Sequence, residues 1–240
     1  MCMKKAIIVG ATSGIGNCLA TLLANNDFRV GITGRRTELL DQLKDKEPEC
    51  FVSRTFDITQ TSSIAGHLEE LTRELGGLDI LVISSGTGDL NDGLDFNIEK
   101  NTIDTNVSGF TAIADWAFNY FSGQKHGHLV AITSIAGLFG NYQAPAYAAS
   151  KAFQLNYLQG LRIKALKNSL PIYITDIRPG FVHTDMAKGE KFFWMSTPEK
   201  AAIQIFNAIR HKRKIAYITK RWVVIAFLFK YLPTQLMEKV

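Results

Sequence analysis

Residues 5–16 read Lys-Ala-Ile-Ile-Val-Gly-Ala-Thr-Ser-Gly-Ile-Gly. The apolar run over 5–9 is typical of a parallel strand that is buried on both faces. The glycines that follow permit a tight turn, and residues 14–25 after them predict a helix. Backbone amides in such a turn can approach a pyrophosphate, which the positive end of the helix attracts. The stretch therefore predicts the strand–turn–helix unit of a dinucleotide-binding fold, although a glycine turn can also be a plain loop.

The glycine spacing is G-x-x-x-G-x-G, one residue different from the commoner dinucleotide fingerprint. No Gly-Lys-Ser/Thr follows, so the turn is not the P-loop of a nucleoside triphosphatase. We expect the turn to supply six cofactor contacts: Gly10, Thr12, Ser13, Gly14, Ile15 and Gly16.

Strand and helix patterns alternate along the rest of the chain. Further strands are expected at 29–33, 51–56, 78–83, 128–133, 172–177 and 215–218. Further helices are expected at 38–46, 62–75, 101–121, 146–167 and 198–211. Such alternation predicts an α/β fold with a doubly wound parallel sheet of about seven strands flanked by helices. We expect one domain over 1–219, followed by an amphipathic tail over 220–240.

Composition excludes several classes of protein. Eight of the 27 Lys and Arg residues lie beyond residue 208, against one acid, Glu238, so the positive net charge of +5 comes from residues 209–240. This argues against a nucleic-acid surface spread over the fold. The three cysteines are far apart, and the five histidines are scattered, so we expect no metal site and no disulfide framework. No signal peptide is expected, and the cysteine usage fits a reducing cytoplasm.

A second motif, Tyr147-Ala-Ala-Ser-Lys151, follows Pro145 and leads into the helix expected at 146–167. Positions four apart lie on one face of a helix, so the phenol and the ammonium would be neighbours. A nearby cation lowers the pKa of a phenol, which could then exchange a proton with a carbonyl or alcohol oxygen. By itself the spacing favours a plainer interpretation, a helix that carries an aromatic residue and a solvated lysine.

Together, the glycine turn and Tyr147-x-x-x-Lys151 resemble the short-chain dehydrogenase/reductase family over roughly residues 5–219. Its members are single-domain Rossmann-fold oxidoreductases that use NAD or NADP. The resemblance implies that Tyr147 is the general acid or base and that Ser134 hydrogen-bonds the substrate oxygen. It implies also that Lys151 binds the nicotinamide ribose and lowers the pKa of Tyr147, and that Asn106 holds a water molecule near the lysine.

The resemblance implies further cofactor contacts at the ends of the later strands. Asp57 and Ile58 would contact the adenine, and a Pro-Gly loop would lie along the nicotinamide. These additional contacts are Asp57, Ile58, Ser85, Gly86, Pro179, Gly180, Val182 and Thr184. One departure stands out, since Ile83-Ser84-Ser85-Gly86 replaces the usual Asn-Asn-Ala-Gly. The glycine is kept, but the asparagine side chains are lost.

The second strand is followed by Arg35 and Arg36, with no acid before Glu38. In Rossmann proteins an acid near this position binds the ribose 2′-hydroxyl, whereas arginine suits a 2′-phosphate. The pattern favours NADP(H) over NAD(H), with Arg35 as the selecting residue beside Arg36 and Ser13. The alternative is a pair of solvated arginines at the start of a helix.

The substrate pocket is expected to be largely apolar and to include Leu138, Gln143, Phe181 and Trp194, although such residues could also be plain core. In the tail, basic residues flank an apolar run over 222–229 that is too short to span a bilayer. The tail could lie peripherally on a membrane, or pack on the body or on another subunit. The resemblance implies a homodimer or homotetramer that pairs the helices at about 102–121 and 146–167.

These features predict an NADP(H)-preferring oxidoreductase that interconverts a carbonyl and an alcohol by hydride transfer, acting mainly as a reductase on an apolar, medium-sized substrate. An NAD-linked alcohol dehydrogenase is the alternative enzyme. A non-catalytic NADP-binding sensor or scaffold is the alternative from a different class, although such a protein would not need Ser134, Tyr147 and Lys151 together.

Overall fold

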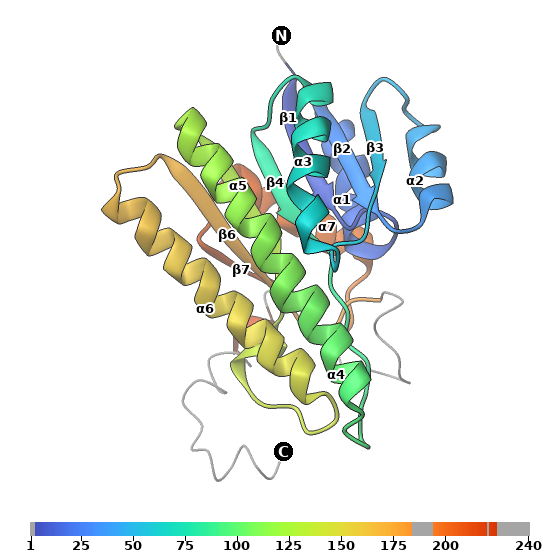
Figure 1. The fold of residues 1–240 in the computed structure, drawn as a ribbon, viewed down its shortest axis with the longest axis vertical. Helices are drawn as coiled ribbons and strands as arrows, with labels where there is room; N and C mark the ends of the chain where they lie inside the picture. The colour runs from blue at the N-terminus through green and yellow to red at the C-terminus, as the bar shows by residue number, and fades with distance from the viewer. Residues whose placement is uncertain (1–2, 184–193, 220, 225–240) are drawn as a thin grey trace.

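The computed structural model describes residues 3–183, 194–219 and 221–224. Seven parallel strands form one sheet in the order β3-β2-β1-β4-β5-β6-β7 (Figure 1). The strands are β1 (Lys4–Val9), β2 (Phe28–Gly34), β3 (Phe51–Thr55), β4 (Ile80–Ile83), β5 (Gly127–Ile132), β6 (Ile172–Pro179) and β7 (Ile215–Ile218). The expected doubly wound parallel sheet is therefore confirmed. Its order reverses between β1 and β4, which places a topological switch point at their carboxyl ends.

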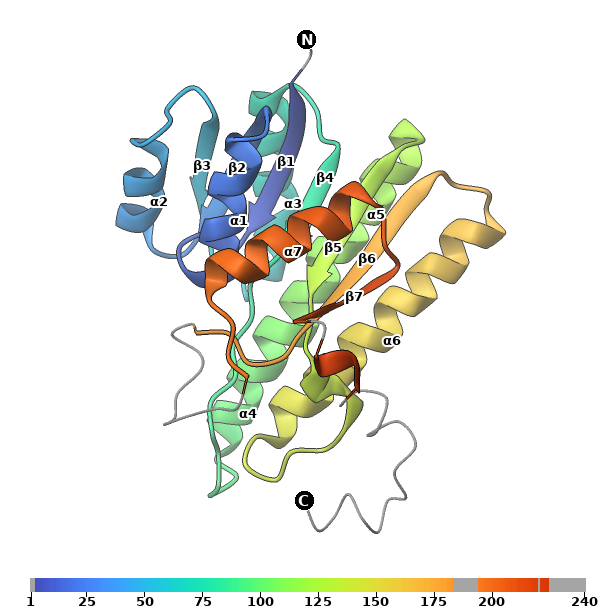
Figure 2. The same ribbon diagram turned by 180° about the vertical axis from the view of Figure 1, so that it is seen from behind.

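Helices cover both faces of the sheet (Figures 1 and 2). They are α1 (Gly14–Ala24), α2 (Thr37–Lys44), α3 (Thr61–Leu75), α4 (Phe96–Ile103), α5 (Phe110–Gln124), α6 (Pro145–Lys167) and α7 (Pro198–Arg210). One buried cluster joins the sheet to α1, α2 and α7, and the other joins it to α3, α5 and α6. Alternate residues of β1 supply the two clusters, with Ala6 and Ile8 in the first and Ile7 and Val9 in the second. This explains why the strand reads as continuously apolar.

The helix expected at 101–121 is longer and less regular than its sequence pattern indicates. It begins at Phe96, because the Asp95 side chain accepts a hydrogen bond from the backbone N–H of Asn97 at 2.8 Å and so caps α4. A π turn, Asp104–Gly109, joins α4 to α5. The prediction missed this turn because one extra residue in a helix leaves the apolar periodicity on either side nearly intact.

The expected tail, 220–240, lies outside the described residues except for 221–224. In these four residues the ring of Trp222 packs against Gly180, where an added Cβ would lie 2.1 Å from the ring atoms. Phe181 packs edge-on against the same indole, with ring centroids 5.5 Å apart. The beginning of the tail therefore contacts the loop that follows β6. Within the described part of the chain, no helix is both long enough and apolar enough to cross a membrane.

A titratable side chain lies inside the sheet. His128 on β5 is 6% exposed, and its Nε2 lies 2.7 Å from the Thr175 hydroxyl on β6. Burial, together with the nearby Lys212 ammonium, lowers the pKa of His128 from 6.5 to about 4. Below pH 6.5 the unfolded chain therefore binds a proton that the folded chain does not bind, and acidification favours unfolding.

We predict that the free energy of unfolding falls by about 2 kcal/mol between pH 7 and pH 5 because of His128 alone. Urea unfolding followed by circular dichroism at the two pH values would measure the change. A His128→Gln variant should lose this part of the pH dependence, whereas His126→Gln, at an exposed position, should keep it. The same pH slope in the His128→Gln variant and the unchanged protein would contradict the assignment.

Candidate functional site

The glycine turn lies at the carboxyl end of β1 and is built on close backbone contacts. Gly10 and Gly14 have φ angles of 93° and 56°, which favour glycine. An added Cβ on Gly16 would lie 2.0 Å from the Gly10 carbonyl oxygen, and one on Gly10 would lie 2.6 Å from the Ser85 nitrogen. The turn is therefore pressed against the loop that follows β4. The buried Ser85 hydroxyl finds no hydrogen-bond partner among the described residues.

The first turn of α1 is open to an anion. Ser13 is the N-cap residue, with φ −160°, but its hydroxyl does not cap the helix. Instead the Ser13 hydroxyl accepts a hydrogen bond from Arg36 Nη2 at 2.7 Å. The amides of the first turn thus receive no side-chain cap from Ser13, and they carry the positive end of the helix dipole. This arrangement and the unpartnered Ser85 hydroxyl fit the pyrophosphate part of a dinucleotide.

The two arginines after β2 point to different partners. Arg36 Nη2 also donates to the Thr12 hydroxyl at 2.8 Å, so this guanidinium lies against the glycine turn. Arg35 faces Asp57 instead, 3.8 Å away, and its side chain is 70% exposed. Of the two candidates for a 2′-phosphate, Arg36 is the one that the structure brings to Ser13. Ile58, next to Asp57, is buried, and its carbonyl oxygen would lie 2.6 Å from a Cβ on Gly109.

Tyr147 stands in the first turn of α6, which begins at Pro145 because proline suits that position. The ring rests on the backbone of Gly88, where an added Cβ would lie 2.3 Å from Tyr147 Cδ2. Ser134 precedes a 3₁₀ turn, Ile135–Leu138, and its side chain lies close enough to the Tyr147 phenol to influence the pKa of that group. Burial raises the pKa of the Tyr147 phenol, and the nearby Ser134 side chain opposes the rise. In the protein alone, burial thus outweighs the lowering of the Tyr147 pKa that the sequence led us to expect.

Lys151 lies one turn further along α6 and is 4% exposed. Its Nζ is 5.7 Å from the centre of the Tyr147 ring, and it donates to Gln154 Oε1 at 3.1 Å and to the Ile132 carbonyl at 3.4 Å. Burial lowers the pKa of Lys151 to about 8, and the Asp176 carboxylate opposes that shift. The Tyr147 ring and the Lys151 ammonium therefore lie close together at the end of β5.

Asn106 is fully buried in the π turn and holds the loop after β4. Its Oδ1 accepts from the Thr87 N–H at 2.9 Å, and its Nδ2 donates to the Thr87 carbonyl at 2.7 Å. The same Nδ2 donates to the Ser150 hydroxyl on α6 at 3.0 Å. The side chain of Asn106 thus ties the loop to α6. Gly86 lies in that loop, where an added Cβ would be 3.4 Å from Lys151 Nζ.

The loop after β6 completes the edge of the sheet. Pro179 ends the strand, and the Gly180 N–H donates to the Ile218 carbonyl at 2.6 Å. Val182 is buried and forms a bridge to Ser196. Thr184, the last predicted contact of this loop, lies outside the described residues.

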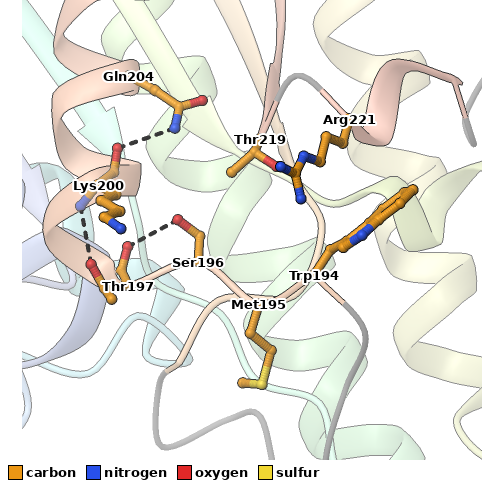
Figure 3. A pocket seen from close by; sticks show the side chains of 8 residues that line it. All are labelled: Trp194, Met195, Ser196, Thr197, Lys200, Gln204, Thr219 and Arg221. Atoms are coloured by element: carbon orange, nitrogen blue, oxygen red, sulfur yellow. Dashed lines mark hydrogen bonds between the residues drawn. The ribbon is translucent and has the colours of Figure 1, made fainter.

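A pocket of about 490 Å³ lies between α7, the segment 194–197 that precedes it, and residues 219 and 221 after β7 (Figure 3). It is lined by Trp194, Met195, Ser196, Thr197, Lys200, Gln204, Thr219 and Arg221. Of the four residues expected in a substrate pocket, Trp194 is the one that lines it. The other three lie elsewhere. Leu138 ends the 3₁₀ turn, and the Gln143 carbonyl accepts a hydrogen bond from the Asn91 N–H. Phe181 packs on Trp222. The lining is polar and cationic as well as aromatic, and the apolar substrate pocket expected from the sequence stays a prediction.

Several residues at the site were missed from the sequence. Thr87 and Gly88 lie in the loop after β4, Gln154 and Asp176 surround Lys151, and none belongs to a recognised motif. Gln154 carried one signal, because a polar residue three positions after Lys151 falls on the buried side of α6. The roles of the other three depend on contacts between segments that are far apart in the sequence.

Comparisons with known proteins agree with this geometry. The family model described as short chain dehydrogenase matches residues 4–191. An uncharacterized oxidoreductase of Myxococcus xanthus is 30% identical over 225 residues, which cover 90% of this chain and 88% of the relative. The structure of serine dehydrogenase from Escherichia coli is 25% identical with a TM-score of 0.76, covering 89% of this chain and 96% of that one. The structure of ElxO with NADP bound has a TM-score of 0.79 at 21% identity, covering 90% and 97%, and is similar in fold.

We predict that Asn106→Leu lowers the free energy of unfolding by about 2–3 kcal/mol, because it leaves the buried Thr87 backbone groups without partners. The matched control is Asn101→Leu at an exposed position of α4, which should change stability by less than about 0.5 kcal/mol. Urea unfolding would measure both values. Equal losses in the two variants would contradict the role of Asn106 in holding the loop.

Proposed function

The chain belongs to the short-chain dehydrogenase family and is an NAD(P)-dependent oxidoreductase, and we propose that it reduces a carbonyl compound with NADPH. The observation that carries the proposal is the meeting of Tyr147, Ser134 and Lys151 at the carboxyl edge of the sheet. The glycine turn lies at the same edge, on the other side of the loop after β4. A hydride donor held by the turn and a proton donor on α6 would therefore face the same substrate.

The residues of the chain have distinct roles in this proposal. When bound, the nicotinamide supplies the hydride. Tyr147 donates its proton to the carbonyl oxygen of the substrate, and the Ser134 hydroxyl holds that oxygen by a hydrogen bond. Lys151 stabilises the charge left on the phenol and binds the nicotinamide ribose. Asn106 keeps the loop after β4 in place beside both reactants.

Cofactor selection is assigned to Arg36 together with Thr12 and Ser13. A 2′-phosphate beside the adenosine ribose would meet the Arg36 guanidinium, which binds phosphate through planar, paired donors. The two hydroxyls that now accept from Arg36 hold it against the glycine turn. Arg35 is the less favoured residue of the pair, because it lies with Asp57. ElxO, a neighbour in fold, has a solved structure with NADP bound, which supports the same choice of cofactor.

The substrate is proposed to be a medium-sized carbonyl compound, with reduction as the main direction. An NAD-linked alcohol dehydrogenase and an NADP sensor are the alternatives, and two measurements separate the three. Fluorescence titration compares binding of NADPH and NADH, and absorbance of the nicotinamide with a panel of aldehydes and ketones detects turnover. Tight binding of NADPH without any turnover would favour the sensor. Assembly of the chain into a homodimer or homotetramer stays a prediction.

We predict that Tyr147→Phe lowers kcat about 10²- to 10⁴-fold, because it removes the proton donor. Binding of NADPH, measured by fluorescence titration, should change little. Tyr142→Phe is the matched control, since Tyr142 is 81% exposed just before the same helix, and it should keep full activity. Full activity in the Tyr147→Phe variant would refute the mechanism.

We predict that Arg36→Ala lowers kcat/KM with NADPH about 10- to 100-fold, as expected for loss of a charged hydrogen bond to phosphate. The value with NADH should stay within about twofold, because NADH has no group for the arginine to bind. Arg35→Ala serves as the control and should have a smaller effect with NADPH. If NADH is as efficient as NADPH in the unchanged protein, the assignment of NADP preference fails.

A further inference from the structure

Gln154 is a polar residue in the middle of α6 and is 1% exposed. Both ends of its carboxamide are bound to residues of the site. Its Oε1 accepts from Lys151 Nζ at 3.1 Å, and its Nε2 donates to the main-chain carbonyl of Asn106 at 2.8 Å. Gln154 thus connects the lysine on α6 with the π turn between α4 and α5.

The π turn explains why the Asn106 carbonyl is available. In a regular helix the N–H of Phe110 would bond to that carbonyl, four residues back. Here the Phe110 N–H reaches the carbonyl of Thr105, five residues back, and that of Val107. Gln154 Nε2 binds the carbonyl that Phe110 leaves. A buried carbonyl without a partner is unfavourable, so the π turn and Gln154 stabilise each other.

The orientation of the Gln154 carboxamide follows from its neighbours. An ammonium group only donates hydrogen bonds, and a carbonyl group only accepts them. Rotating the carboxamide by 180° would place two donors together at Lys151 and two acceptors together at Asn106. One orientation therefore satisfies both neighbours, and it directs the amide oxygen at Lys151.

The charged and titratable groups around Lys151 are few among the described residues. Tyr147 lies on the same helix, and the Asp176 carboxylate on β6 favours the charged amine. Arg178 binds Asp176 with Nε 2.7 Å from Oδ2, and Arg162 on α6 also interacts with that carboxylate. On the α4 side, Glu99 accepts from the Ala146 N–H at the start of α6. The loop after β4 and the π turn present Gly86 and Asn106, which carry no charge.

We propose that Gln154 is a positioning residue of the reductase reaction, which holds the Lys151 ammonium beside Tyr147 with its oxygen and the π turn of Asn106 with its nitrogen. The effect on catalysis rests on the proposed function, whereas the hold on Lys151 rests on the hydrogen bonds of Gln154 alone. The amide oxygen stabilises the ammonium form of Lys151 in a site where burial favours the neutral amine. Gln154 therefore acts on the reaction through Lys151 and does not touch the reactants.

Two variants separate this role from simple packing. Gln154→Met keeps the length of the side chain and removes both hydrogen bonds. Gln154→Glu keeps an acceptor for Lys151, adds a negative charge and removes the donor to Asn106. We expect the pKa of Lys151 to fall by about one unit in the first variant and to rise by about one unit in the second. A purely structural role would not shift the pKa in opposite directions.

The pKa would be measured by NMR on protein with lysine labelled with ¹³C at Cε, without cofactor. The signal of Lys151 is the one that is absent from the spectrum of a Lys151→Met variant. Gln159→Met and Gln159→Glu, at an exposed position of the same helix, are the matched controls and should leave the titration unchanged. The inference would be overturned if either Gln154 variant had the same Lys151 pKa as the unchanged protein.

A second measurement follows kcat for carbonyl reduction with NADPH against pH. The fall of kcat at alkaline pH should move to lower pH in Gln154→Met and to higher pH in Gln154→Glu. Each shift should be about one pH unit, the same as the expected shift in the Lys151 pKa. An alkaline limb that stays in place while the Lys151 pKa shifts would overturn the catalytic part of the inference. If the unchanged protein reduces no carbonyl compound, the proposed function fails, and the NMR titration still decides whether Gln154 holds Lys151.

Discussion

A buried lysine ammonium is the constraint on which the arrangement of this site depends. Moving a charge out of water is costly unless other groups replace the lost hydration. For Lys151 these groups come from three places, namely Gln154 on α6, the Ile132 carbonyl at the end of β5, and the Asp176 carboxylate on β6. Burial nevertheless lowers the pKa of Lys151 to about 8, because the Asp176 carboxylate offsets only part of its effect. The pKa of Lys151 therefore lies near neutral pH, where the amine can gain or lose its proton.

Close backbone contact is the second constraint, and glycine makes it possible. Gly16 lies on the Gly10 carbonyl, Gly88 lies under the Tyr147 ring, and Gly180 lies under the Trp222 indole. Each contact brings a segment nearer to its neighbour than any side chain would allow. The glycine turn, Tyr147 and the beginning of the tail are thus all set against the carboxyl edge of one sheet. Rigid strands position these segments, and α6 carries Tyr147 and Lys151.

Local patterns predicted most of the fold and the centre of the site. The apolar run and glycines of 5–16, and the four-residue spacing from Tyr147 to Lys151, depend on neighbours in the sequence, so they could be read directly. The π turn at Asp104–Gly109 could not be read, since it displaces the helix by one residue without changing its composition. Thr87 and Asp176 could not be found either, because their contacts join segments that are distant in the sequence. Residue spacing describes single elements and contains no information about such pairs.

The two arginines after β2 show how a sequence motif can leave the contacting residue undecided. Both follow the strand, and the sequence favours Arg35 as the contact for a 2′-phosphate. Successive side chains at a strand end point in different directions, so two adjacent residues contact different parts of the protein. Arg36 is directed toward the hydroxyls of Thr12 and Ser13, while Arg35 is directed toward Asp57 after β3. The structure therefore places the Arg36 guanidinium against the glycine turn and the Arg35 guanidinium near the loop that follows β3.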